Sequence, residues 1–373
     1  MSLPCLQLSH HHQTNMTHVP SSSHPATNLP LMSAHAKVPE AYLWPEKERP
    51  AYEAGEPLNE PVIDLSGFLS ADEASIRLAA DMVGSACQKH GFFQVRNHGV
   101  GGDLISRAVM EAEAFFGLPL HKKEKVQGYS YGHSHRFASK LPWKETFSFP
   151  FHASNPALAL NHLQSILGGH ESAKTGLVYK EYCEAMTDLA MKILELLAIS
   201  LGLERTTFRR FYQDSCSLLR CNFYPPCEEP DLTLGTGPHC DPTSLTILHQ
   251  DHVGGLEVFA AEKWRRVAPR PGALVINIGD TFMALTNGKY RSCLHRAVVN
   301  RDSERKSLAF FLNPNKDNIV RAPEELVLKD GRRVYPDFTW AAFLGFTQHN
   351  YRADMNTLDE FCSWLLNQGQ QQK

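Results

Sequence analysis

A series of short apolar segments between Ser217 and Asn313 constrains the fold of this 373-residue chain more than any other feature. Turns containing Gly or Pro separate the segments, and seven of them occupy about a hundred residues. Strands in this rhythm are typical of a double-sheet jelly roll rather than a parallel α/β sheet. The predicted strands are S-L-L-R-C-N-F-Y, S-L-T-I-L-H, G-L-E-V-F, W-R-R-V, A-L-V-I-N-I, R-A-V-V-N and S-L-A-F-F-L.

Helical patterns flank these strands on both sides, so we expect a mainly β fold with flanking helices. Asp72 and Gly91 are placed to begin and end one helix, and Gly202 to end another. The run P-V-I-D-L and the run F-F-Q-V-R-N-H predict short strands before the core. The expected organisation is a disordered tail at 1–37, a mixed helical region at 38–213, a jelly-roll core at 214–315, and a helical closing segment at 316–373.

Composition limits the classes of partner. A net charge of −3 gives no reason to expect nucleic acid or an anionic membrane, so a small-molecule substrate is favoured. The nine cysteines form no C-x-x-C pair, which suits a reducing compartment. We found no apolar run of transmembrane length and no secretion signal at the first residues. A monomer in the cytoplasm is therefore the expectation.

Three residues have the character of metal ligands. His239 and Asp241 stand at i and i+2 in G-P-H-C-D-P, a spacing that places both on one face of an extended strand. His295 follows about fifty residues later in S-C-L-H-R-A. Two histidines and one carboxylate are the ligand set of a non-haem Fe(II) site, which leaves three octahedral positions open.

A second His-x-Asp pair, His249 and Asp251, competes with the first. It ends an alternating strand just before V-G-G, where we expect a hairpin tip with solvated side chains. The first pair instead leads toward a strand, and alternation would turn Cys240 away from the metal. The first pair is therefore the predicted site.

Polar side chains on two further strands extend this site. Arg305 and Ser307 share one face of their strand and suit the binding of a carboxylate, although a structural salt bridge would also explain Arg305. Asn222 and Tyr224 share a face with Arg220, opposite an apolar face. They would offer an amide and a phenol to a ligand, or satisfy the following P-P turn; spacing favours neither interpretation.

At this point the chain resembles the plant 2-oxoglutarate- and Fe(II)-dependent dioxygenases, whose core is a double-stranded β-helix. The resemblance rests on His239-x-Asp241, His295 and Arg305-x-Ser307, and it covers about residues 38 to 365. Within it, N-F-Y-P-P-C resembles the family's N-Y-Y-P-P-C element, departing only by one aromatic ring. P-V-I-D-L and H-G-F-F-Q-V-R-N-H-G-V resemble its N-terminal region.

The resemblance implies roles for these residues. His239, Asp241 and His295 would hold Fe(II), to which 2-oxoglutarate binds before O2, with ascorbate as reductant. Arg305, Ser307 and Tyr224 would bind the distal carboxylate of 2-oxoglutarate, with Asn222 nearby.

The hexapeptide L-P-W-K-E-T resembles the marker of gibberellin 20-oxidases and matches it without departure. This similarity implies stepwise oxidation of the C-20 methyl group of gibberellin precursors to alcohol, aldehyde and a C19 lactone. We hypothesise that Trp143 packs on the diterpenoid rings and Lys144 pairs with a substrate carboxylate. The alternative is that Trp143 anchors the loop and Lys144 is solvated. The residues expected to bind substrate are Leu141, Trp143, Lys144, Glu145 and Thr146.

Two other functions stay open. One is a sibling dioxygenase that acts on another gibberellin position or on a flavonoid, against which the hexapeptide argues. The other is a non-catalytic metal-binding jelly roll, which would leave Arg305 and Ser307 unused.

Overall fold

A computed structural model describes most of the chain. The described residues are 37–50, 55–131, 140–167, 171–350 and 354–371. The tail expected at 1–37 lies outside them except for Lys37.

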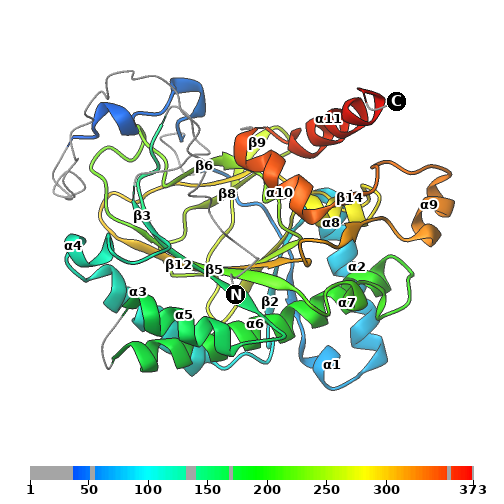
Figure 1. Cartoon of the computed structure of the whole chain (residues 1–373), viewed down its shortest axis with the longest axis horizontal. Helices are drawn as coiled ribbons and strands as arrows, with labels where there is room; N and C mark the ends of the chain where they lie inside the picture. The colour runs from blue at the N-terminus through cyan, green and yellow to red at the C-terminus, as the bar shows by residue number, and fades with distance from the viewer. Residues whose placement is uncertain (1–36, 51–54, 132–139, 168–170, 351–353, 372–373) are drawn as a thin grey trace.

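Two sheets form the core, and helices cover the outer face of the larger one (Figure 1). The smaller sheet has the order β6 (Thr236–His239), β11 (His295–Ala297), β8 (Leu256–Ala260) and β9 (Lys263–Arg266). The larger sheet has the order β1 (Val62–Asp64), β2 (Phe92–Arg96), β10 (Leu274–Ile278), β7 (Leu245–Gln250), β12 (Arg305–Asn313), β5 (Cys216–Tyr224), β4 (Glu145–His152) and β3 (Tyr129–Tyr131). Its neighbouring strands are antiparallel, except that β1 and β2 run parallel. This arrangement confirms the predicted mainly β core.

All seven predicted core strands are present, but two local predictions were wrong. His249 and Asp251 do not lie at a hairpin tip, because β7 pairs with β10 and β12 whereas β8 pairs with β11 and β9 in the other sheet. The strand expected through G-P-H-C-D-P ends at His239 as β6, so Asp241 lies in the loop that follows. The segment after β7 is therefore a crossover between the sheets.

The helices follow the sequence pattern closely. In α2, the Asp72 carboxylate accepts a hydrogen bond of 2.8 Å from the backbone N–H of Ser75, which caps the first turn. At the other end Gly91 has φ +70°, and a Cβ there would stand 2.0 Å from the Arg291 carbonyl oxygen, so only glycine fits. The described α-helices are α1 (Ser66–Leu69), α2 (Glu73–Lys89), α3 (Gly102–Phe116), α4 (Leu120–Lys123), α5 (Ala157–Leu167), α6 (Glu171–Ser200), α7 (Thr207–Phe211), α8 (Asp280–Leu285), α9 (Glu324–Asp330), α10 (Trp340–His349) and α11 (Thr357–Gln371).

Helix α6 is the main support of the larger sheet. It carries an apolar stripe, and the stripe residues Leu189, Ile193 and Leu197 are fully buried. The helix contacts α2, α3 and α5 and also β7 and β12 (Figure 1). Burying one such side chain contributes about 1.5–3 kcal/mol, so α6 holds rigid the two strands that carry polar residues into the interior.

Two segments before the core strands contain buried side chains. Gln94 on β2 is buried, and its amide donates to Glu60 Oε1 at 2.5 Å and to the Ala268 carbonyl at 2.9 Å. In the arm formed by residues 37–50, Tyr42 and Trp44 are buried. Tyr42 packs edge-on against Trp143 with ring centroids 5.5 Å apart. The arm therefore completes a small apolar cluster over the jelly roll.

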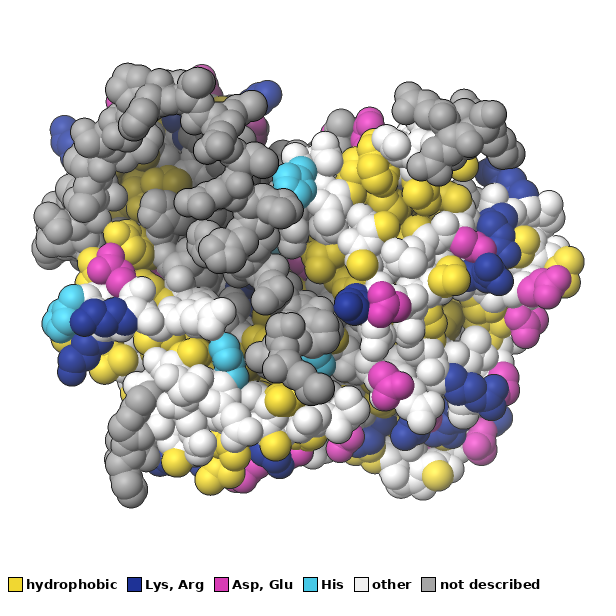
Figure 2. All heavy atoms as spheres, viewed as in Figure 1, with side chains coloured by type: hydrophobic (Ala, Val, Ile, Leu, Met, Phe, Trp, Pro, Cys, Tyr) yellow, Lys and Arg dark blue, Asp and Glu magenta, His cyan; other side chains and the backbone are white. Residues whose placement is uncertain are grey.

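The described surface shows no dominant sign of charge in the view of Figure 2, where basic and acidic side chains alternate over the helical side. Among the described helices, none has both the length and the apolar character that crossing a bilayer requires. The described cysteines other than Cys216 are free thiols.

Candidate active site

The two predicted histidines and the aspartate meet at one end of the smaller sheet. His239 ends β6 and lies directly opposite His295, which begins β11. Asp241 Oδ1 is 3.6 Å from His239 Nε2 and 3.7 Å from His295 Nε2. One ligand atom from each of the three residues lies within 4.8 Å of the others. Among the described residues, this is the group of side chains that could hold a metal ion.

Both imidazole rings are oriented by backbone carbonyl groups. His239 Nδ1 is 2.8 Å from the Gly237 oxygen, and His295 Nδ1 is 3.1 Å from the Cys293 oxygen. A carbonyl can only accept, so each Nδ1 carries the proton and donates it. Each Nε2 is then left with a lone pair toward the shared centre, which is the state that a metal ligand requires.

The Asp241 carboxylate is held from behind by two donors. Its Oδ2 accepts hydrogen bonds from Thr246 Oγ1 at 2.7 Å and from Asn277 Nδ2 at 2.9 Å. Burial raises the pKa of this carboxyl, but the nearby His295 and His239 and these hydrogen bonds outweigh burial and lower the pKa to about 2. Asp241 is therefore ionised near neutral pH, with Oδ1 directed at the histidines.

This donor set fits Fe(II). Two neutral imidazoles and one carboxylate, all from one side, leave positions for further ligands, whereas structural zinc sites close with four protein ligands. The three side chains are mostly buried, which limits the access of water. The arrangement can hold a metal that binds and activates small molecules.

Asn222, Tyr224, Arg305 and Ser307 form a second polar group on neighbouring strands of the larger sheet. Arg305 lies directly opposite Tyr224, and Ser307 directly opposite Asn222, as the predicted alternation requires. Asn222 Nδ2 donates to Ser307 Oγ at 3.1 Å, and the Arg305 guanidinium carbon lies 4.7 Å from the centre of the Tyr224 ring.

Arg305 has the character of an anion site. Its side chain is only 2% exposed, yet Nε and Nη1 have no hydrogen-bond partner among the described residues. A buried guanidinium with unpaired donors is costly unless an anion completes it. The backbone comes close to the Arg305 side chain at Gly255. This residue has φ +94°, and a Cβ there would come within 3.4 Å of Arg305 Cδ. These residues therefore suit the distal carboxylate of 2-oxoglutarate.

Three residues missed by the sequence analysis support the two groups. Thr246 and Asn277 hold Asp241, as described above. Gln250 lies directly opposite Ser307 in the β7–β12 ladder, and its buried amide has no described hydrogen-bond partner. Strand alternation along S-L-T-I-L-H could have placed Thr246 and Gln250 on one face, but which face pointed inward was not visible without the pairing of β7.

Asp251 of the competing pair has a structural role. The Asp251 carboxylate accepts hydrogen bonds from the backbone N–H groups of Val253 at 3.0 Å and Lys306 at 2.5 Å. It thereby fastens the crossover after β7 to the start of β12. Cys240 also lies outside the metal group, and its thiol donates weakly toward the Ser292 carbonyl at 3.9 Å.

The hexapeptide places its residues mainly in the protein interior. Trp143 is fully buried, and its indole N–H donates to the Pro225 carbonyl at 3.2 Å. Glu145 is also buried, where it accepts from Tyr129 at 2.6 Å and pairs with Lys123 at 2.5 Å. The bond to Pro225 fits the alternative that Trp143 anchors the loop, while substrate contact by Trp143 and Glu145 stays a prediction.

The other three residues expected to bind substrate are less deeply buried. The Leu141 side chain packs at the edge of the Trp143 cluster, and Thr146 Oγ1 lies 3.5 Å from the Ser130 carbonyl oxygen. Lys144 is half-buried and directs its ammonium group to Thr236.

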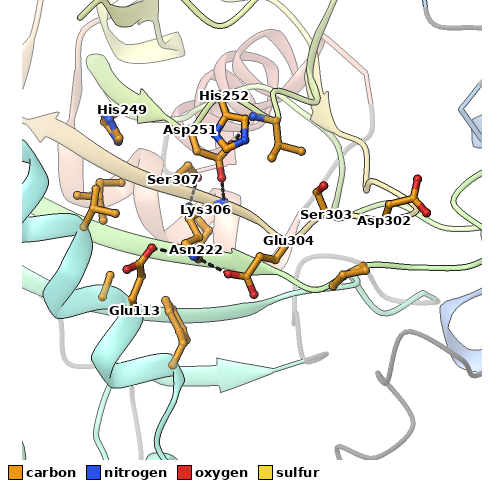
Figure 3. Close-up of a pocket in the computed structure, with 16 residues that line it drawn as sticks. Glu113, Asn222, His249, Asp251, His252, Asp302, Ser303, Glu304, Lys306 and Ser307 are labelled. Atoms are coloured by element: carbon orange, nitrogen blue, oxygen red, sulfur yellow. Dashed lines mark hydrogen bonds and ion pairs between the residues drawn. The ribbon is translucent and has the colours of Figure 1, made fainter. Parts of the chain in front are cut away.

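A cavity of about 490 Å³ lies between α3 and the β7–β12 strands (Figure 3). Lys306, Leu308 and Glu113 of α3 line it, as do Asn222 and Ser307, whereas none of the three metal ligands does. Lys306 spans it, pairing with Glu113 at 2.7 Å and with Glu304 at 2.5 Å. Arg305 does not line this cavity, whereas Ser307 lines it together with Lys306, although alternation along the strand placed these two on opposite faces.

Comparisons with known families agree with this geometry. Residues 215–314 match the 2OG-Fe(II) oxygenase superfamily, and residues 61–165 match the family described as non-haem dioxygenase in morphine synthesis N-terminal. The first match contains all three metal ligands together with Arg305 and Ser307.

Curated relatives narrow the family. Gibberellin 20 oxidase 3 of Arabidopsis thaliana is 52% identical over 349 residues, which cover 90% of this chain and 92% of that protein. Gibberellin 20 oxidase 1-B of Triticum aestivum is 49% identical over 355 residues, covering 93% and 97%. The chain belongs to the gibberellin 20-oxidases. It is therefore an Fe(II)- and 2-oxoglutarate-dependent dioxygenase that uses O2, and the predicted enzyme class and cofactors are confirmed.

Solved structures show that the fold is shared beyond the gibberellin 20-oxidases. The crystal structure of JOX2 in complex with 2OG, Fe and JA has a TM-score of 0.77 and 30% identity, covering 91% of this chain and 98% of that chain. The rice dioxygenase for auxin oxidation has a TM-score of 0.69 and 27% identity, covering 81% and 99%. The predicted jelly-roll fold with a helical N-terminal region is thus confirmed.

Proposed function

We propose that this gibberellin 20-oxidase oxidises the C-20 methyl group of gibberellin precursors stepwise to the alcohol and the aldehyde, followed by loss of that carbon to give a C19 lactone. The close similarity to curated gibberellin 20-oxidases supports this reaction. Bound Fe(II) and 2-oxoglutarate supply the oxidising chemistry with O2, as 2-oxoglutarate is converted to succinate and CO2.

The residues of the protein would bind and orient the metal and 2-oxoglutarate, and they would exclude water. His239, Asp241 and His295 would hold the metal. Arg305 and its neighbours on β5 and β12 would bind the distal carboxylate and so fix the direction in which 2-oxoglutarate reaches the metal.

The observation that carries the assignment of 2-oxoglutarate is the buried guanidinium of Arg305, whose Nε and Nη1 have no hydrogen-bond partner among the described residues. A purely structural jelly roll would place a carboxylate side chain against it, and no described residue does so. A metal-binding protein without 2-oxoglutarate chemistry would leave this group unsatisfied at a cost of several kcal/mol.

The test is turnover with identified products. The protein is incubated with Fe(II), 2-oxoglutarate, ascorbate and twenty-carbon gibberellin precursors, with and without a 13-hydroxyl group, and the products are identified by mass. We expect products that carry the C-20 alcohol and aldehyde, and then products that lack one carbon. Hydroxylation elsewhere on the skeleton would instead identify a sibling dioxygenase, and no succinate with any precursor would contradict catalysis.

We also propose that the enzyme acts as a monomer in the cytoplasm. All residues assigned to the metal and to 2-oxoglutarate come from one chain. Light scattering after size-exclusion chromatography would test the first point, since a dimer mass at assay concentration would contradict it. Imaging of a fluorescent fusion in plant cells would test the second.

A further inference from the structure

Lys144 of the hexapeptide reaches the pocket of Tyr224 and Arg305. Its ammonium donates a hydrogen bond of 2.9 Å to Thr236 Oγ1, which lies at the start of β6. The same ammonium lies 5.9 Å from the centre of the Tyr224 ring. Lys144 therefore contacts the strand that ends in the metal ligand His239 and the ring that faces Arg305.

Tyr224 is held between these two cations. Its hydroxyl is 3.3 Å from Thr236 Oγ1, so Lys144, Thr236 and Tyr224 form one chain of polar contacts. Although burial raises the pKa of Tyr224, the positive charges of Lys144 and Arg305 lower it overall. The phenol is thus a stronger hydrogen-bond donor toward an anion than a phenol in water.

Close packing restricts the positions of Lys144, Thr236 and Tyr224. Gly235 lies against Tyr224, and a Cβ at Gly235 would come within 2.5 Å of Tyr224 Cδ1. The backbone N–H of Trp143 donates to the Leu234 carbonyl at 2.9 Å, which fastens the hexapeptide to the same segment. A fully buried Trp143 beside it then fixes where Lys144 can reach.

We infer that Lys144 is a positioning residue for 2-oxoglutarate, which acts through Thr236 to hold the Tyr224 hydroxyl beside Arg305 for the distal carboxylate. This inference rests on the proposed function. It assigns the lysine of the hexapeptide to the cosubstrate rather than to a carboxylate of the gibberellin, as the sequence had suggested.

The test separates the affinity for 2-oxoglutarate from the affinity for gibberellin. Three variants are compared with the Fe(II)-loaded wild type under argon by calorimetric titration with 2-oxoglutarate alone: Lys144→Met, Lys144→Arg and Thr236→Val. We expect Lys144→Met and Thr236→Val each to raise the Kd for 2-oxoglutarate about tenfold, the size of a lost hydrogen bond to a charged group. Lys144→Arg should recover much of the loss because it keeps the charge and a donor.

Steady-state kinetics supply the second readout. The KM for 2-oxoglutarate should rise with its Kd in Lys144→Met and Thr236→Val, while the KM for the gibberellin precursor stays within about twofold. Lys89→Met, which removes an exposed lysine at the end of α2, is the matched control and should change neither.

The opposite split would overturn the inference: an unchanged Kd for 2-oxoglutarate and a raised gibberellin KM in Lys144→Met would make Lys144 a substrate anchor. The titration needs no turnover, so it stands apart from the proposed reaction, which would fail separately if wild-type protein yielded no C-20 product.

Discussion

The two donors behind Asp241 should control how tightly the enzyme binds its metal. Thr246 and Asn277 together occupy Oδ2 and leave Oδ1 facing His239 and His295. Thr246→Val removes one donor but keeps the shape of the side chain. The carboxylate can then rotate, and Oδ1 is no longer fixed at the metal position.

The size of the effect follows from the bonds involved. Each donor forms a buried hydrogen bond to an ionised group, and such a bond contributes about 1.5–3 kcal/mol. At about 1.4 kcal/mol for each factor of ten, Thr246→Val should weaken metal binding about tenfold to a hundredfold, in line with substitutions behind other metal ligands. Asn277→Leu should have an effect of the same size.

Anaerobic competition with a chromogenic chelator measures the Fe(II) affinity directly. Thr246→Ser keeps the hydroxyl and should retain most of the affinity. Thr233→Val is a matched control, because Thr233 is equally buried but its hydroxyl has no described hydrogen-bond partner. Wild-type affinity in both Thr246→Val and Asn277→Leu would refute the idea that these donors orient the ligand.

Three further results are expected. Arg305→Lys should raise the Kd for 2-oxoglutarate at least tenfold, because an ammonium cannot replace a two-pronged guanidinium, and a titration showing wild-type affinity would contradict the pocket. Trp143→Ala should lower the free energy of unfolding by about 3–5 kcal/mol in a denaturant titration, and Trp143→Phe by less; a wild-type midpoint with a raised gibberellin KM would instead favour substrate contact. Burial and the charge of Lys89 lower the pKa of His90 to about 4. Between this value and about 6.5, the imidazole binds a proton in the unfolded chain but stays neutral in the folded protein. The free energy of unfolding should therefore fall as the pH drops through this range. His90→Gln should make the melting temperature less dependent on pH across this range, and parallel curves would exclude His90 as a cause.

The metal ligands and the carboxylate pocket could be predicted because most of their residues stand two positions apart, a spacing that places both side chains on one face of a strand. Arg305 and Ser307 follow strand alternation, and β12 confirms it residue by residue. The support around Asp241 could not be predicted, since Thr246 and Asn277 come from strands whose pairing depends on long-range contacts. The burial of Gln94 could not be predicted either, because a polar residue can face inward where its hydrogen-bond partner, here Glu60, is also buried.

The sequence of the hexapeptide predicted the class of enzyme but not the role of each of its residues. Its match to a family marker pointed to the correct class of enzyme, but a marker does not say whether a residue touches the substrate or holds the loop. Trp143 and Glu145 are hydrophobic and charged residues of the kinds that bind diterpenoid acids, yet both are used to fix β4 and the segment before it.

The order of strands in the larger sheet bears on how the nascent chain reaches its active form. Strands β1 to β4 leave the ribosome first but occupy the two ends of this sheet, and the places between them belong to β5, β7, β10 and β12. Strand β4 has an open edge until β5 is made, and β2 has one until β10 is made, and β12 joins the two halves of the sheet only when residue 313 has been synthesised. Open edges of this kind can pair wrongly. Helix α6 is made just before the central strands and packs against β7 and β12. It can thus act as a template that shields apolar surface during translation, and loss of its apolar stripe should lower the yield of soluble enzyme before it affects the chemistry.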